Sequence, residues 1–136
     1  MAQFIYAYDL DGGERRTQVF QAGGTIIENQ PVKLSSGKVV ACAGGDSNIV
    51  GVSVHAATNG QPVEVITNRR AVFKCEYKGS SKTSLTVDDI GSLFDYSPSD
   101  NKLNLDDTAD ATLAVVDFNN EGKYAWVVVA EAARAL

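Results

Sequence analysis

Short runs of β-branched and other apolar residues recur every eight to twelve residues along this chain. Clusters of Gly, Asn and Ser separate the runs, and the chain contains 12 Gly but only three Pro. This rhythm is typical of a barrel or sandwich built from short antiparallel strands. No long helical pattern alternates with the runs, which argues against a parallel βαβ fold. The clearest runs lie at residues 4–8, 17–20, 31–34, 38–42, 49–56, 62–66, 71–77, 111–118 and 123–130. The sequence therefore predicts a single all-β domain with a small β-barrel.

Local patterns give the expected strands their faces and ends. Ser35-Ser-Gly37 predicts a tight hairpin loop between two strands. The alternation through 71–77 predicts one buried face made of every second residue. The apolar run Val127–Val129 favours a central strand that is covered on both faces. Residues 86–94 predict a helical turn or an irregular packed segment, and residues 130–136 predict a short helical tail. The polar segment 79–84 predicts an exposed, mobile loop.

Size, charge and cysteine content exclude several classes of protein. The 136 residues suit one domain, and the net charge of −5, from 17 acidic and 12 basic residues, argues against a nucleic-acid partner. Cys42 and Cys75 form no metal or disulfide motif, so we interpret them as small buried residues of a chain made in a reducing cytosol. There is no signal-peptide pattern and no apolar stretch long enough to span a membrane.

The residue types that carry catalysis or bind metals form no recognisable site. His55 is the only histidine, and it fits a strand residue hydrogen-bonded to a neighbour better than a general base. No serine lies in a nucleophile elbow, and the Gly pairs lack the lysine of a phosphate loop. Asp9-x-Asp11 and the carboxylates of 106–110 could attract calcium, although Asp is also a common turn residue. We therefore expect no enzyme activity, no metal and no cofactor.

The N-terminal stretch carries an aromatic stripe, because Phe4, Tyr6 and Tyr8 alternate along an expected strand and would share one face. The stripe is either the first strand of the barrel or part of an arm that docks on a partner, since Tyr and Phe are favoured in interface cores. We accordingly expect residues 1–20 to form an N-terminal arm or first strands, and residues 21–136 to form the barrel domain.

The succession of strands and turns between Gly24 and Tyr77 follows a known order. Gly51 and Val52 match a G-V step within I-V-G-V-S, and Gly60 and Val63 match the turn and strand after it. The later segments 88–93 and 111–129 continue the order. In these features the chain resembles the capsid decoration (cement) proteins of tailed bacteriophages.

The resemblance implies a β-barrel or tulip-like domain that forms a homotrimer and lies on the outer surface of a virion. It implies the major capsid protein as partner, whose subunits the protein would bridge and stabilise. Many members have Gly before the strand at 71–73, where this chain has Arg69 and Arg70. This pair and the aromatic stripe are the candidate partner-binding residues: Phe4, Tyr6, Tyr8, Arg69 and Arg70.

Two other functions stay open from the sequence. One is a carbohydrate- or receptor-binding β module of a phage tail or surface assembly, which needs an exposed aromatic platform. Trp126 is the only tryptophan, and its apolar neighbours predict a core position instead. The other is a small enzyme with its active site in a β-barrel, which would need a pocket lined by carboxylates or by His55.

Overall fold

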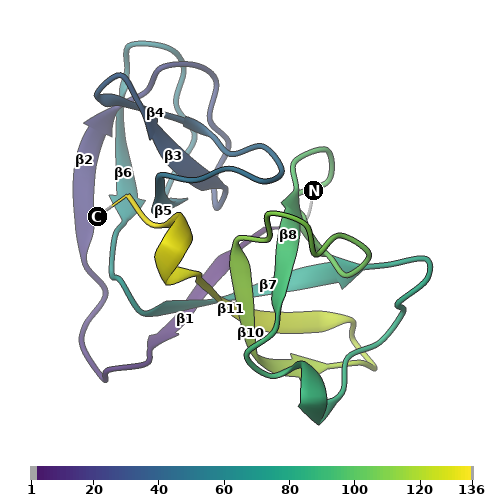
Figure 1. The fold of residues 1–136 in the computed structure, drawn as a ribbon. Helices are drawn as coiled ribbons and strands as arrows, with labels where there is room; N and C mark the ends of the chain where they lie inside the picture. Colours follow the sequence, from purple (N-terminus) through teal and green to yellow (C-terminus); the bar gives the residue numbers. More distant parts are fainter. Residues whose placement is uncertain (1–2, 136) are drawn as a thin grey trace.

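The computed structural model describes residues 3–135, which form two lobes built from eleven strands (Figure 1). The strands are β1 (Ile5–Asp9), β2 (Thr17–Gln21), β3 (Pro31–Ser35), β4 (Lys38–Ala41), β5 (Ile49–Ser53), β6 (Pro62–Ile66), β7 (Ala71–Lys78), β8 (Leu93–Ser97), β9 (Lys102–Asn104), β10 (Leu113–Asn119) and β11 (Tyr124–Val129). The helical segments are two 3₁₀ turns, η1 (Val87–Asp89) and η2 (Glu131–Ala133). The predicted all-β class is confirmed.

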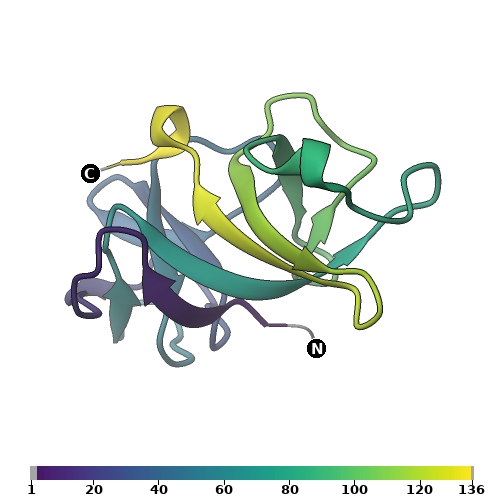
Figure 2. The ribbon, with the colours of Figure 1, turned by 90° about the horizontal axis from the view of Figure 1, so that it is seen from below.

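The larger lobe, called the barrel lobe below, contains a closed barrel of five strands. Its sheet has the order β1-β7-β11-β10-β8-β9, and β9 pairs again with β7 to close the ring. The closing pair is parallel, with Tyr77 opposite Leu103, whereas the other pairs of this sheet are antiparallel. β1 is left outside the ring and lies along β7 at the boundary between the lobes (Figure 2). The expectation of a small β-barrel is therefore confirmed.

The smaller lobe contains the sheet β2-β6-β5-β3-β4. Its β3–β4 hairpin has the predicted tight turn, with Ser35 opposite Lys38 and positive φ at Ser36 and Gly37. Positive φ at both central residues is the mark of a type I′ turn, whose twist matches the flanking strands. The smaller lobe is built from residues 17–66. The expected boundary near residue 20, between an N-terminal segment and the barrel domain, therefore falls inside strand β2 of this lobe.

Alternation of side chains produces the barrel core. In β7, Ala71, Phe73, Cys75 and Tyr77 are buried on the inner face, as predicted. Ile49, Val52 and Ile66 of the smaller sheet pack into the same hydrophobic cluster, so the two lobes share part of one core. A second cluster fills the smaller lobe, and its members include Val32, Val39, Val50, Val63 and Val65.

Two predictions about β11 are wrong. Ala125, Val127 and Val129 point into the barrel and are buried, so the residues between them face outward. Val128 is only partly buried, and the strand is not covered evenly on both faces. Trp126 is likewise a partly exposed residue of the outer face, not a core residue, and its ring lies 5.5 Å from the Lys74 ammonium. A barrel strand has only one core face, which a continuous apolar run does not reveal.

The smaller elements agree with expectation only in part. β5 ends at Ser53, so His55 lies beyond the strand. The predicted turns in 86–94 and 130–136 are η1 and η2, with Leu136 outside the described residues. The expected loop 79–84 is tethered by Asp106, whose carboxylate accepts the backbone N–H groups of Ser80, Ser81 and Lys82 at 2.6, 3.0 and 2.9 Å. These bonds lower the pKa of Asp106.

Candidate binding groove between the two lobes

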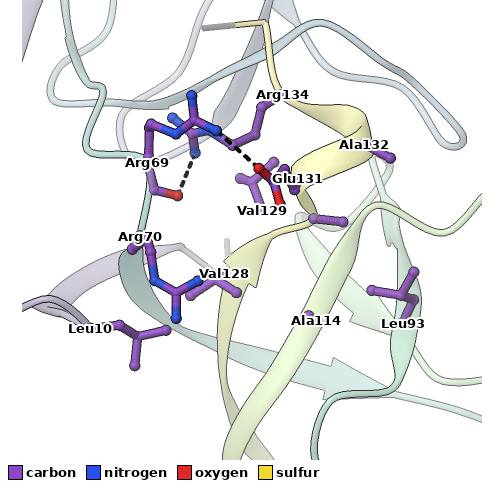
Figure 3. A pocket seen from close by; sticks show the side chains of 11 residues that line it. Leu10, Arg69, Arg70, Leu93, Ala114, Val128, Val129, Glu131, Ala132 and Arg134 are labelled. Carbon is purple, nitrogen blue, oxygen red and sulfur yellow. Dashed lines mark hydrogen bonds and ion pairs between the residues drawn. The ribbon is translucent and has the colours of Figure 1, made fainter.

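An open groove of about 380 Å³ lies where the barrel lobe meets the smaller lobe (Figure 3). It is lined by Leu10, Arg69, Arg70, Leu93, Ala114, Val128, Val129, Ala130, Glu131, Ala132 and Arg134. These residues come from the position just after β1, the β6–β7 connection, β8, β10, β11, and η2 with its flanking residues. We call this feature the interlobe groove.

The floor of the interlobe groove is the outer face of the barrel sheet. Leu93 pairs with Ala114, and Ala114 pairs with Val128 across three neighbouring strands. Their sequence neighbours Phe94, Leu113, Val127 and Val129 are buried in the barrel core, so these three side chains face outward. Leu10 and Leu93 remain exposed at the two sides of the groove. The floor is therefore an apolar surface that no part of residues 3–135 covers fully.

Arginine side chains form one wall of the groove. Arg69 makes an ion pair with Glu131 at 3.2 Å, and Arg70 makes one with Asp11 at 3.3 Å. Both pairs are largely exposed, so each contributes little to stability. Arg134 donates to the backbone oxygens of Arg69 at 2.9 Å and Thr67 at 3.3 Å, and burial together with the nearby Arg69 charge lowers its pKa. Arg134 thus fixes the backbone that carries the other two guanidinium groups.

Asn68 ties the start of the chain to this wall. Its Nδ2 donates to Asp9 Oδ2 at 2.9 Å and to the Glu14 backbone oxygen at 2.7 Å. Its Oδ1 accepts the backbone N–H of Arg16 at 2.5 Å. One side chain therefore holds the β1–β2 connection against the β6–β7 connection. The bond from Asn68, followed by the backbone N–H of Asp11, lowers the pKa of Asp9.

Replacing Asn68 with Ala should raise the pKa of Asp9 toward its ordinary value of 3.8. A lowered pKa means that folding favours the carboxylate, so these bonds stabilise the connection above pH 3.8 and are lost as the pH falls through the lowered value. Carbon NMR titration of the Asp9 carboxyl measures the change directly. The exposed Asn59→Ala serves as control and should leave the Asp9 midpoint in place. An unchanged midpoint in Asn68→Ala would show that another group sets it.

The structure separates the five predicted partner-binding residues into two groups. Tyr8, Arg69 and Arg70 lie together at the boundary between the lobes, because Tyr8 pairs with Val72 and Leu10 N–H donates to the Arg70 oxygen at 3.0 Å. Phe4 is only 1% exposed, and its ring packs on Tyr96 with centroids 5.6 Å apart.

A bulge in β1 divides the aromatic stripe. Tyr6 pairs with Phe73 and Tyr8 pairs with Val72, so the two partners are adjacent although the two tyrosines are not. Tyr6 therefore faces the core, where its ring contacts Phe73 at 6.2 Å, and Tyr8 faces solvent. The expectation that Phe4, Tyr6 and Tyr8 share one face is wrong, because the extra residue of a bulge reverses the alternation.

The remaining candidates for chemistry lie apart from the groove. His55 is exposed, and its Nε2 accepts the Glu64 N–H at 3.2 Å. Cys42 and Cys75 are buried free thiols, and burial raises the pKa of each, which disfavours a reactive thiolate. Among residues 3–135, no three His, Cys, Asp or Glu side chains are grouped to hold a metal ion. None of the helical segments in this part of the chain has the length and apolar character needed to cross a membrane.

Several groove residues were not predicted from the sequence. Leu10, Leu93 and Val128 look like ordinary apolar residues of turns and strands, and only the sheet register reveals their outward direction. One sequence signal points to the role of Asn68. It lies in the connection between two apolar strands, where an Asn side chain commonly forms hydrogen bonds with the backbone. Arg134 lies 64 residues after Arg70, and no local pattern connects them.

The architecture defines an all-β protein in which a closed five-stranded barrel and a smaller five-stranded sheet share part of their core. It is similar to the crystal structure of the head fiber gp8.5 N base in bacteriophage phi29, with a TM-score of 0.56 and 14% sequence identity. The similarity covers 88% of this chain and 98% of that chain. No protein-family model and no curated protein sequence matches the chain. At this identity the likeness establishes a shared fold.

Proposed function

We propose that this chain is a structural protein of a phage particle that binds the outer surface of the capsid. The similarity to a head fiber N base over nearly the whole of both chains supports the proposal most directly. The decoration-protein resemblance of the sequence, carried by the strand at Ile49–Ser53 and the turn at Gly60, points to the same particle surface. Bridging of neighbouring major capsid protein subunits, without catalysis or a cofactor, is the proposed mode of action.

The proposed oligomer is the homotrimer that the decoration-protein resemblance implies, and several weak contacts made together by a trimer would give tight binding. Linked binding modules can exceed the affinity of one module by about 10²- to 10⁴-fold. The interlobe groove supports an interaction role for the subunit, since it combines an exposed apolar floor with the Arg69 and Arg70 wall. Apolar cores with arginine are characteristic of protein interfaces.

Cosedimentation tests the proposal. Purified protein is mixed with expanded capsids of its phage that lack it, the particles are pelleted, and bound protein is quantified. We expect saturable binding at a fixed ratio to the major capsid protein and greater resistance of the capsids to heat. Capsids of an unrelated phage are the matched control and should bind none. Absence of saturable binding to the cognate capsids would contradict the proposal.

A second candidate function rests on the outer face of β11. The Lys74 ammonium lies 4.2 Å from the Tyr124 ring centroid and 5.5 Å from that of Trp126, so two partly exposed aromatic rings lie side by side around a cation. Such rings could stack on a sugar or on another receptor group. A glycan array separates the alternatives: binding that Trp126→Ala abolishes would favour a carbohydrate- or receptor-binding module.

A further inference from the structure

The charges of the chain are divided between two regions. All five arginines lie in segments that meet around the interlobe groove, namely the β1–β2 connection, the β6–β7 connection and the residues after η2: Arg15, Arg16, Arg69, Arg70 and Arg134. The segment 88–121, which belongs to the barrel lobe, contains nine acidic residues and one basic residue, Lys102. Asp95 is buried, and Asp89 and Asp100 pair with Lys82 and Lys78, but Asp88 is exposed and presents a negative charge that an arginine of a second copy would complement.

The η1 turn combines acidic and apolar side chains on an exposed surface. Val87 is 78% exposed and Ile90 is 45% exposed, and Asp88 between them is exposed as well. Both apolar side chains are therefore available for a contact that buries them. The composition of the turn complements that of the groove. Its apolar side chains can pack on the floor formed by Leu93 and Val128, and its carboxylate can pair with the arginine wall.

Local bonds hold this turn in one conformation before any contact forms. Asp89 Oδ2 accepts the Thr86 backbone N–H at 2.8 Å and pairs with the Lys82 ammonium at 3.1 Å. Asp88 takes no part in this capping network and makes no ion pair to another residue of 3–135. A pre-organised segment loses less conformational entropy on binding than a flexible one.

We propose that the interlobe groove binds the Val87–Ile90 turn of a second copy of this chain, with Asp88 against Arg70 and the two apolar side chains on the groove floor. The contact joins two different surfaces of the subunit, so it is heterologous and closes into a ring at the appropriate rotation. The turn lies only a few residues before Leu93, which lines the groove, so the donor and acceptor surfaces are neighbours on one subunit. The proposal rests on the self-association included in the proposed function.

Charge reversal at both sides of the contact tests the pairing. Sedimentation velocity over a wide concentration range gives the dissociation constant of the oligomer for the wild type, Arg70→Glu, Asp88→Arg and the double variant. We expect each single change to raise that constant about tenfold or more, as truncating or reversing interface charges does. The double variant should recover most of the loss, because it restores opposite charges across the contact. Lys38→Glu and Glu28→Arg, both at exposed positions of the smaller lobe, are the matched controls and should leave the constant unchanged.

Removal of the apolar side chains tests the same contact independently of charge. Val87→Ser with Ile90→Ser should raise the dissociation constant by a similar factor, and thermal unfolding should remain near the wild type because both side chains are exposed in the subunit. A wild-type protein that stays monomeric, or an oligomer that none of these variants weakens, would overturn the inference.

Capsid binding distinguishes failure of this contact from failure of the proposed function. Under both proposals, Arg70→Glu weakens capsid binding by about a hundredfold through loss of multivalency, and the double variant restores it. A monomer that still binds capsids saturably would overturn the contact and leave the capsid role intact. An oligomer that responds to the variants but binds no capsid would establish the contact and contradict the capsid role.

Discussion

Gly51→Ala should destabilise the protein by about 3 kcal/mol or more, because an added methyl group has no space in the smaller sheet. A Cβ at Gly51 would lie 1.7 Å from the backbone oxygen of Ile66 and 3.4 Å from a Val65 methyl carbon. The first of these neighbours is backbone of the adjacent strand β6, which is hydrogen-bonded to both β2 and β5. The substitution must therefore separate two paired strands, and a side-chain rotation cannot relieve the clash.

Urea unfolding followed by circular dichroism measures this loss as a lower midpoint at an unchanged slope. Gly24→Ala is the matched control, since nothing lies within 4 Å of a Cβ at that glycine, and we expect an effect within about 0.5 kcal/mol. Equal stability of the two variants would show that β5 and β6 separate readily. That result would also weaken the sequence resemblance, in which Gly51 is one of the matched positions.

Phe4→Ala should cost about 3–5 kcal/mol of folding stability, as expected for the loss of a fully buried aromatic side chain. Phe4 is 1% exposed and packs edge-on against Tyr96, whose hydroxyl donates to Asn101 at 2.6 Å. A docking arm would behave in the opposite way, because an exposed Phe would leave stability unchanged and affect only binding to the partner. The experiment therefore decides between the two interpretations of the N-terminal stretch that the sequence leaves open.

Tyr8→Ala provides the comparison within the same strand. Tyr8 is 45% exposed and lies beyond the bulge of β1, so its loss should cost less than about 1 kcal/mol. Thermal unfolding of the two variants side by side shows the difference as unequal decreases in the midpoint. Equal decreases would indicate that β1 is held to β7 mainly by backbone hydrogen bonds, and that the bulge does not divide a core face from a solvent face.

The sequence predicts those parts of the fold that depend on neighbours along the chain. β7 shows the plain alternation of a strand with one core face, and Ser36-Gly37 has the residues that a two-residue hairpin turn requires. β1 and β11 were harder to interpret. A bulge at β1 shifts the register after Tyr6, and β11 exposes Val128 and Trp126 although its sequence is continuously apolar. Which face of such a strand is covered depends on closure of the barrel, through contacts between distant segments.

The candidate site was less predictable than the fold for the same reason. The sequence identifies Tyr8 as part of an aromatic stripe, and it identifies Arg69 and Arg70 as a basic pair. Pairing of β1 with β7 brings these three residues together. Phe4 was selected by the same pattern and is buried. Leu93 and Val128 carry no chemical signature, and they join the site only because three strands place them in one row.

The interlobe groove draws its walls from the beginning, middle and end of the described chain, at Leu10, Arg69–Arg70 and Val128–Arg134. During synthesis Leu10 leaves the ribosome long before Arg134, so a partly synthesised subunit lacks a complete interlobe groove. A chain that stops before β11 would also lack Val127, which is fully buried in the barrel core. Self-association through such a groove would therefore be limited to subunits that have been completed and folded.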